Sequence, residues 1–107
     1  MVAALSHGER RLLELAIALA MEPKVLLLDE PMAGLGPKDS SQVIQLLASL
    51  RDSYGILLIE HDMDAVFQLS DRISVLVYGE VLTTDTPENV RQSPAVREAY
   101  LGDSAPC

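Results

Sequence analysis

Two short runs of aliphatic residues, each followed by acidic residues, constrain the fold of this chain more than any other feature. Val25–Leu28 is followed by Asp29 and Glu30, and Ile56–Ile59 is followed by Glu60–Asp62. Wholly apolar runs of this length are typical of strands that are covered on both faces, as in a parallel sheet. We therefore expect two parallel strands with ionisable residues at their carboxyl ends.

Helices and a hairpin are expected around these strands. Strong helix formers and capping residues predict five helices. The first three are residues 9–21, a helix that Asp39 or Ser40 caps and that runs to about Ser49 or Arg51, and Met63–Leu69. The last two are a helix opened by Thr86–Glu88 and one from Pro94 to Gly102. Ile73–Tyr78 and Val81–Thr84, which Gly79-Glu80 joins, are expected to form the hairpin. Strands that alternate with helices predict an α/β fold with mostly parallel strands, flanking helices and a C-terminal antiparallel hairpin.

Composition and charge exclude several classes of protein. The 107 residues, of which 49% are hydrophobic, suffice for one modest domain over residues 1–107. The net charge of -8 has the wrong sign for a surface that neutralises nucleic-acid phosphates. The longest apolar run, Leu15–Met21, is far shorter than the about 20 residues of a membrane-spanning helix. The single cysteine, Cys107, permits no internal disulfide and fits a reducing cytosol.

The two strand ends carry the first candidate site. Ligands of open α/β sheets bind beyond the carboxyl ends of the strands, where this chain has Asp29, Glu30 and His61. An Asp-Glu pair after an apolar strand can hold Mg²⁺ through water and orient a water for attack on a phosphate. The alternative is that both carboxylates end a strand in solvent and that His61 is a structural, hydrogen-bonded histidine.

A second candidate site precedes the first helix. The small residues Ser6 and Gly8 let a backbone approach an anion closely, and the helix directs free N–H groups toward it. The alternative is a capping box between Ser6 and Glu9, which lies three residues further on.

Four motifs in a fixed order resemble the ATP-binding subunits of ABC transporters. Leu5–Glu9 (LSHGE) is similar to the family signature LSGGQ, and Val25–Pro31 (VLLLDEP) is similar to Walker B with its catalytic Glu. Ala33–Pro37 (AGLGP) lies where the family's D-loop lies, and Ile59–Asp62 (IEHD) contains the switch histidine. The resemblance runs from residue 5 to residue 102 and implies a partial sheet of the P-loop NTPase fold.

The resemblance implies a role for each motif residue. Glu30 is expected to be the general base or water-orienting carboxylate, Asp29 the Mg²⁺ partner through water, and His61 a contact to the γ-phosphate of ATP. The residues expected to complete the ATP site of an opposite, head-to-tail subunit are Ser6, His7, Gly8 and Glu9. The residues expected to form the D-loop are Gly34, Leu35 and Gly36. Gly36 departs from the common Asp, which puts D-loop coupling between subunits in doubt, whereas His7 and Glu9 are milder departures.

Longer segments resemble one branch of the family. The branched-chain amino-acid (Liv-type) uptake branch is the one that three segments resemble: EHDMDAVFQLSDRISVLVYGEV, TPENVRQSPAVREAYLG and EPMAGLGPKD. The related urea importers share LSHG and EHDM. The branch implies a subunit that couples ATP hydrolysis to import and lies peripherally on the cytoplasmic face of the plasma membrane. Its implied partners are an identical or related second ATPase, membrane permease subunits and, indirectly, a periplasmic binding protein that sets the substrate.

One expected motif does not occur in the 107 residues: the phosphate loop GxxxxGK[ST]. We therefore expect residues 1–107 to be the C-terminal half of one nucleotide-binding domain, without its Walker A half. ATPase activity of this chain alone is not expected, because the main charge-stabilising element is missing. The family's sheet order places the missing strand between Ile56–Ile59 and Ile73–Val77, so exposed sheet edges and apolar patches are expected.

Besides the ATP-binding subunit of a urea or amide importer, two other functions stay open. One is a non-catalytic half-domain that offers Ser6 and Gly8 to the ATP site of a full-length partner. The other is a soluble relative in DNA repair or translation, which ranks last because the chain is acidic and has no coiled-coil heptad run. An in-frame upstream phosphate loop would favour the transporter subunit over the half-domain.

Overall fold

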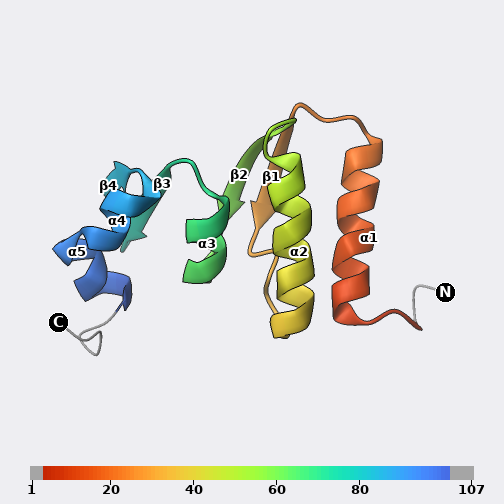
Figure 1. Cartoon of the computed structure of the whole chain (residues 1–107), viewed down its shortest axis with the longest axis horizontal. Helices are drawn as coiled ribbons and strands as arrows, with labels where there is room; N and C mark the ends of the chain where they lie inside the picture. The colour runs from red at the N-terminus through yellow and green to blue at the C-terminus, as the bar shows by residue number, and fades with distance from the viewer. Residues whose placement is uncertain (1–3, 102–107) are drawn as a thin grey trace. The chain divides into compact units, whose positions relative to one another are not determined.

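The chain forms two compact units, one up to Leu69 and one from Ser70 onward. The computed structural model describes residues 4–101. Figure 1 labels most of the helices and strands of both units along the chain. The two units are called the first unit and the second unit below, and each is described by itself.

The first unit has a strand–helix–strand core that the sequence predicted. Its helices are α1 (His7–Ala20), α2 (Pro37–Leu50) and α3 (Met63–Leu69), and its strands are β1 (Val25–Asp29) and β2 (Gly55–Ile59). The strands pair in parallel, from Val25 opposite Gly55 to Asp29 opposite Ile59. A parallel pair needs a long crossover, and α2 provides it. The carboxyl ends of β1 and β2 therefore meet at the same edge of the sheet.

The core of the first unit joins its three helices to the segment after β1. Helices α1 and α2 lie side by side (Figure 1) and are in contact, as are α2 and α3. The buried residues of this core are Leu15, Met32, Val43, Leu47 and Ala65. Burying aliphatic side chains contributes about 1.5–3 kcal/mol each, so this cluster is the main source of stability in the first unit.

The expectation that both faces of the strands are covered is wrong. Along β1, Leu26 is 4% exposed, whereas its neighbours Val25 and Leu27 are 58% and 72% exposed. On β2, Leu57 and Ile59 are 58% and 56% exposed. Successive side chains of a strand point to opposite faces, so one face of the pair packs on the core and the other is open. The exposed apolar patch agrees with the incomplete coverage that the sequence analysis expected.

The second unit begins with an antiparallel hairpin. Strand β3 (Ile73–Val77) pairs with β4 (Glu80–Asp85), with a register irregularity between Val75 and Leu76. The sequence analysis placed the turn at Gly79-Glu80, but Tyr78 and Gly79 form it, with φ of 50° and 78°. Two positive φ values are required by the tight turn that suits the twist of a hairpin, and Gly79 adopts one without steric cost.

Short helices follow the hairpin, as expected. They are α4 (Pro87–Gln92), α5 (Pro94–Val96) and the π-helix η2 (Arg97–Leu101). The Thr86 hydroxyl caps α4 by accepting a hydrogen bond from the Asn89 N–H. The expected helix end at Gly102 lies outside the described residues.

The start of α2 differs from the prediction. Asp39 or Ser40 was expected to cap this helix, but it begins at Pro37, with Gly36 at the N-cap and no capping hydrogen bond from a side chain. Proline is favoured in the first turn because its φ is already helical and the N–H that it lacks has no partner there. Asp39 therefore lies within the first turn.

In residues 4–101, the strands form two two-stranded sheets, β1-β2 and β3-β4. The strand that the family resemblance places between the second and third strands stays a prediction. Within residues 4–101, no helix has the length and apolar character needed to cross a membrane.

Candidate functional site

Glu30 follows β1 in an uncommon backbone conformation. Its φ is 48°, in the left-handed region that residues other than glycine, asparagine and aspartate rarely adopt. Its N–H donates a 2.7 Å hydrogen bond to the carbonyl of Ile59, at the end of β2. The bond continues the pairing of β1 and β2 by one residue and ties Glu30 to the strand that precedes His61.

Glu30 and His61 meet at the carboxyl ends of the two strands, as the sequence predicted. Nε2 of His61 lies 2.8 Å from Oε1 of Glu30. The Glu30 side chain is 44% exposed and the His61 side chain 76% exposed, so both are open to solvent. A carboxylate and an imidazole in this position can hydrogen-bond water and phosphate oxygens.

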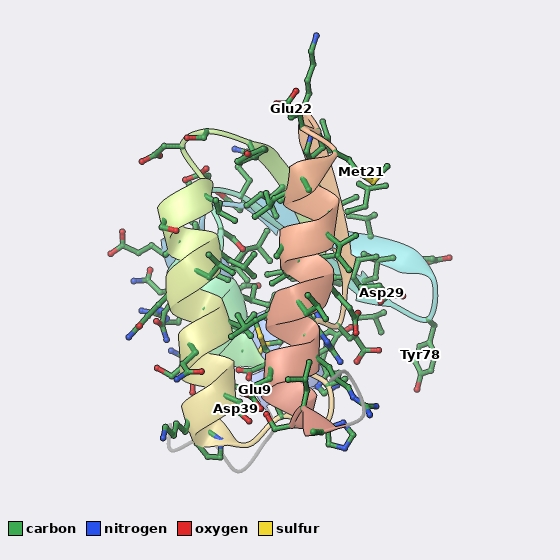
Figure 2. The ribbon with its side chains drawn as sticks, turned by 90° about the vertical axis from the view of Figure 1, so that its right-hand side faces the viewer. Glu9, Met21, Glu22, Asp29, Asp39 and Tyr78 are labelled. Carbon is green, nitrogen blue, oxygen red and sulfur yellow. The ribbon has the colours of Figure 1, made fainter. Side chains whose placement is uncertain are left out.

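Asp29 does not join this pair. It is the last residue of β1 and is exposed, in the alternating pattern that also exposes Val25 and Leu27. Figure 2 shows its side chain outside the space between α1 and α2. Asp29 and Glu30, adjacent in sequence, therefore face different surroundings.

Glu60 is a site residue to which the sequence analysis gave no role. Its carboxylate accepts hydrogen bonds from the backbone N–H groups of Met32 and His61, both at 3.1 Å, and of Asp62 at 3.4 Å. One potential metal-binding atom from each of Glu30, Glu60 and His61 lies within 4.8 Å of the others. The position of Glu60 at the end of a strand, like that of Asp29, was the available signal.

Arg11 is a second residue that the sequence analysis did not find. From α1, its guanidinium donates to the carbonyl oxygens of Glu30 and Ala33, both at 3.3 Å, and to that of Pro31. No motif could have identified it, because all its acceptors are backbone groups about 20 residues further along the chain.

The start of α1 contains the capping box that was the alternative to an anion site. The Ser6 hydroxyl accepts from the Glu9 N–H at 3.1 Å, and the Glu9 carboxylate accepts from the Ser6 N–H at 2.9 Å. The hydrogen bond from the Ser6 backbone, followed by that with its side chain, lowers the pKa of Glu9. The Ser6 hydroxyl uses a lone pair in this cap, and its own proton can still be donated to an anion. His7 is exposed beside it.

Gly8 is buried where α1 meets α2. A Cβ at this position would lie 2.6 Å from Oδ2 and 2.8 Å from Cβ of Asp39. Figure 2 shows Glu9 and Asp39 at the same end of the two helices. Gly8 thus permits a close helix contact, a packing role that the sequence analysis did not expect.

The segment expected to be the D-loop has one glycine that its backbone requires. Gly34 has a φ of 77°, which glycine adopts without strain, and Leu35 packs against the core. Gly36 has a φ of -74° and open space around a Cβ position. The backbone therefore does not require glycine at position 36, where the family commonly has Asp.

Two protein families match separate parts of the chain. The ABC transporter family matches residues 1–33. The branched-chain amino acid ATP-binding cassette transporter family matches residues 80–106. The first match contains the signature-like and Walker B-like motifs, and the second covers the hairpin's second strand and the helices after it.

Curated relatives and solved structures are similar over nearly the whole chain. The branched-chain amino acid transport ATP-binding proteins LivG of Escherichia coli and BraF of Pseudomonas aeruginosa are 46% and 44% identical over 94% of the chain. The ADP conformation of MJ1267, an ATP-binding cassette of an ABC transporter, is 30% identical, with a TM-score of 0.80 over 94% of this chain and 41% of that one. The chain spans 40% of the length of LivG and BraF. The chain is therefore similar over nearly its whole length to ATP-binding proteins of ABC transporters, among them relatives named for branched-chain amino acid transport.

Proposed function

We propose that this chain supplies the signature and Walker B parts of the ATP-binding subunit of an ABC importer for branched-chain amino acids. The observation that carries the proposal is the 2.8 Å contact between Glu30 and His61 at the carboxyl ends of two parallel strands. Relatives named as branched-chain amino acid transport ATP-binding proteins support the substrate class.

Glu30 is the residue proposed to act on the attacking water. Its carboxylate is open to solvent and can accept a hydrogen bond from water, which orients the water's lone pair toward the γ-phosphate. The N–H that His61 directs at Glu30 can be donated to a γ-phosphate oxygen, which then replaces the carboxylate as its acceptor. Asp29 is proposed to hold Mg²⁺ through water.

The exposed carboxylate of Asp29 fits hydrated Mg²⁺, because this ion keeps several of its waters and uses one or two carboxylates. When bound with ATP, Mg²⁺ neutralises charge that develops on the phosphates. Glu60 fits this role less well, since backbone N–H groups already occupy its carboxylate oxygens.

The signature residues are proposed to face the ATP of a second subunit. The Ser6 hydroxyl is exposed at the start of a 14-residue helix, whose N-terminal dipole favours an anion. Ser6 to Glu9 and the loop Gly34 to Gly36 are proposed to complete the opposite ATP site in a head-to-tail pair. Permease subunits on the cytoplasmic face of the membrane, with a periplasmic binding protein beyond them, are the further partners that we propose.

The second candidate function is a non-catalytic module. The 107 residues contain no GxxxxGK[ST], and the exposed apolar face of β1 and β2 offers a surface for another chain. We expect no ATP turnover above the blank when the isolated chain is assayed with Mg²⁺ and ATP, because its 107 residues contain no phosphate loop to bind the phosphates. Turnover that Glu30→Gln abolishes would contradict this expectation.

A hybrid protein tests the main proposal. Residues 4–101 replace the aligned segment of Escherichia coli LivG, whose remaining residues complete the cassette. Glu30→Gln is expected to lower kcat by about 100-fold, because general-base assistance contributes at least that much, while nucleotide binding persists. The matched control is Glu14→Gln, which changes an exposed carboxylate on α1.

Three outcomes of the hybrid experiment are informative. Loss of turnover in Glu30→Gln with normal turnover in Glu14→Gln supports the proposal. Equal turnover in both variants contradicts the role of Glu30. A hybrid that binds ATP without hydrolysing it favours the non-catalytic module.

A further inference from the structure

The segment that follows β1, Glu30–Ala33, is held from two sides by charged side chains that the proposed function does not use. On one side, Arg11 donates to the carbonyl oxygens of Glu30, Pro31 and Ala33. On the other side, the Glu60 carboxylate accepts from the Met32 N–H at 3.1 Å. These two side chains are named the Arg11–Glu60 bracket.

The segment needs this support because its first residue is strained. A left-handed φ, here 48° at Glu30, is unfavourable for a residue with a Cβ and persists only where surrounding contacts fix it. Local turn bonds help: the Ala33 N–H donates to the Glu30 carbonyl at 3.0 Å. That same carbonyl also accepts from Arg11, so the α1 side chain reinforces the turn from outside.

Glu60 connects this segment to the one that carries His61. The same carboxylate that holds Met32 also accepts from the N–H groups of His61 and Asp62. The backbones on both sides of the Glu30–His61 contact therefore share one anchor.

We infer that Arg11 and Glu60 are positioning residues, which fix the backbones of residues 30–33 and 61–62 so that the Glu30 carboxylate meets Nε2 of His61. The action of the Glu30–His61 pair on ATP rests on the proposed function. The geometry of the pair does not depend on that function. Neither side chain needs to touch nucleotide, since each acts through backbone groups.

The chemistry of both side chains suits this task. The guanidinium of arginine presents five donors in a rigid, planar fork, which lets one side chain serve three carbonyls, whereas a lysine ammonium is a compact point charge. The ionised carboxylate of glutamate accepts on both oxygens, and its hydrogen bonds are about twice as strong as neutral ones. Arg11→Lys and Glu60→Gln therefore weaken the bracket while keeping side-chain length.

The test is NMR spectroscopy of the labelled 107-residue chain, which reads the His61 Nε2 resonance without any nucleotide. Glu30→Gln gives the shift that corresponds to loss of the pair. Arg11→Lys and Glu60→Gln are each expected to move the resonance by at least about half of that shift. Glu60→Gln is also expected to speed amide exchange at Met32 by about tenfold, because the charged acceptor is lost.

Matched controls replace neighbouring charged side chains on α1. Arg10→Lys and Glu14→Gln alter exposed residues and are expected to leave the His61 resonance in place. A general loss of stability would move resonances of the core cluster as well, so retained core resonances separate positioning from a purely structural role.

Each result decides the inference. A wild-type His61 resonance in folded Arg11→Lys and Glu60→Gln overturns it. Unfolding of both variants also overturns it, because a positioning role leaves the core intact; if only one unfolds, the other decides. A hybrid cassette that fails to hydrolyse ATP would refute the proposed function and leave this geometric result standing.

Discussion

The two units differ in how far apart their paired strands lie along the chain. In the first unit, β1 and β2 are separated by the whole of α2, whereas in the second unit only Tyr78 and Gly79 separate β3 from β4. A two-residue turn determines the register of a hairpin locally, but a parallel pair depends on the packing of its crossover helix. The comparison shows that tertiary contacts matter more for the first unit.

The two units also differ in how their polar side chains are brought together. Glu30, Glu60 and His61 meet in the first unit because parallel strands bring their carboxyl ends to one edge. In the second unit, Asn89 donates locally to Asp85 at 2.9 Å, and the Tyr100 hydroxyl donates to the Leu76 carbonyl on β3. A reactive group assembled from distant segments thus depends on a long crossover, which the hairpin does not have.

The largest effect is expected from a substitution in the core of the first unit. Leu47 is 1% exposed, and Leu47→Ala should lower the free energy of unfolding by about 3 kcal/mol through lost burial and the cavity left behind. Urea unfolding followed by circular dichroism measures the change. Val90→Ala, at a 2% exposed position of the second unit, is the matched variant.

Amide exchange shows whether the two units unfold separately. Leu47→Ala should increase exchange in β1 and β2 while β3 and β4 keep their protection, and Val90→Ala should do the reverse. Equal loss of protection in all four strands after either substitution would show that the chain unfolds as one cooperative unit.

A smaller effect is expected at the helix contact of the first unit. Gly8→Ala places a Cβ 2.8 Å from Cβ of Asp39, so the helices must shift. Overpacking costs about 1–3 kcal/mol, and the better helix propensity of alanine offsets about 1 kcal/mol, so a net loss of about 1 kcal/mol is expected. Thermal unfolding measures it.

Gly36→Ser is the control for this substitution. Position 36 has open space and an ordinary φ of -74°, so the control should change stability by only a few tenths of a kcal/mol. Equal changes in both variants would show that the contact between Gly8 and Asp39 does not restrict the helices.

The smallest expected effects are in acid, where Glu9 in the first unit and Asp85 in the second are hydrogen-bonded carboxylates with a lowered pKa. Hydrogen bonds lower the pKa of Glu9, mainly from the Ser6 backbone, and that of Asp85, mainly from the Asn89 side chain. A lowered folded-state pKa stabilises the fold above the ordinary pKa, and this contribution is lost as the pH falls below about 4. Glu9→Gln and Asp85→Asn should therefore flatten the acid limb of a plot of Tm against pH.

Glu88→Gln provides the comparison for these two variants, because it removes an exposed carboxylate from the first turn of α4. An acid limb as steep in Asp85→Asn as in the unchanged protein would refute the link between the hydrogen bonds of Asp85 and the stability of the second unit.

Local patterns were sufficient to predict most of the fold and half of the site. Apolar runs and helix spacing identified the strands and helices, and residues after strand ends pointed to Glu30 and His61. The start of α2 was missed because Pro37 competes with Asp39 and Ser40 as a start signal. The apolar run of β1 by itself predicted cover on both faces, because such a run does not tell which face is covered, whereas the missing strand implied by the resemblance predicted the open patch.

By itself, the sequence determined the order of helices and strands, the acidic ends of β1 and β2, and the motifs that resemble ABC transporter ATP-binding subunits, since these depend on spacing and local propensity. Only the tertiary structure decided that Arg11 and Glu60 hold the segment around Glu30 and that Asp29 lies apart from it. The physical reason is that these side chains bond to backbone groups 19 to 28 residues away, and such bonds depend on strand register and helix packing. Every residue type has the same backbone acceptor, and every type except proline has the same backbone donor, so the sequence does not mark the partners.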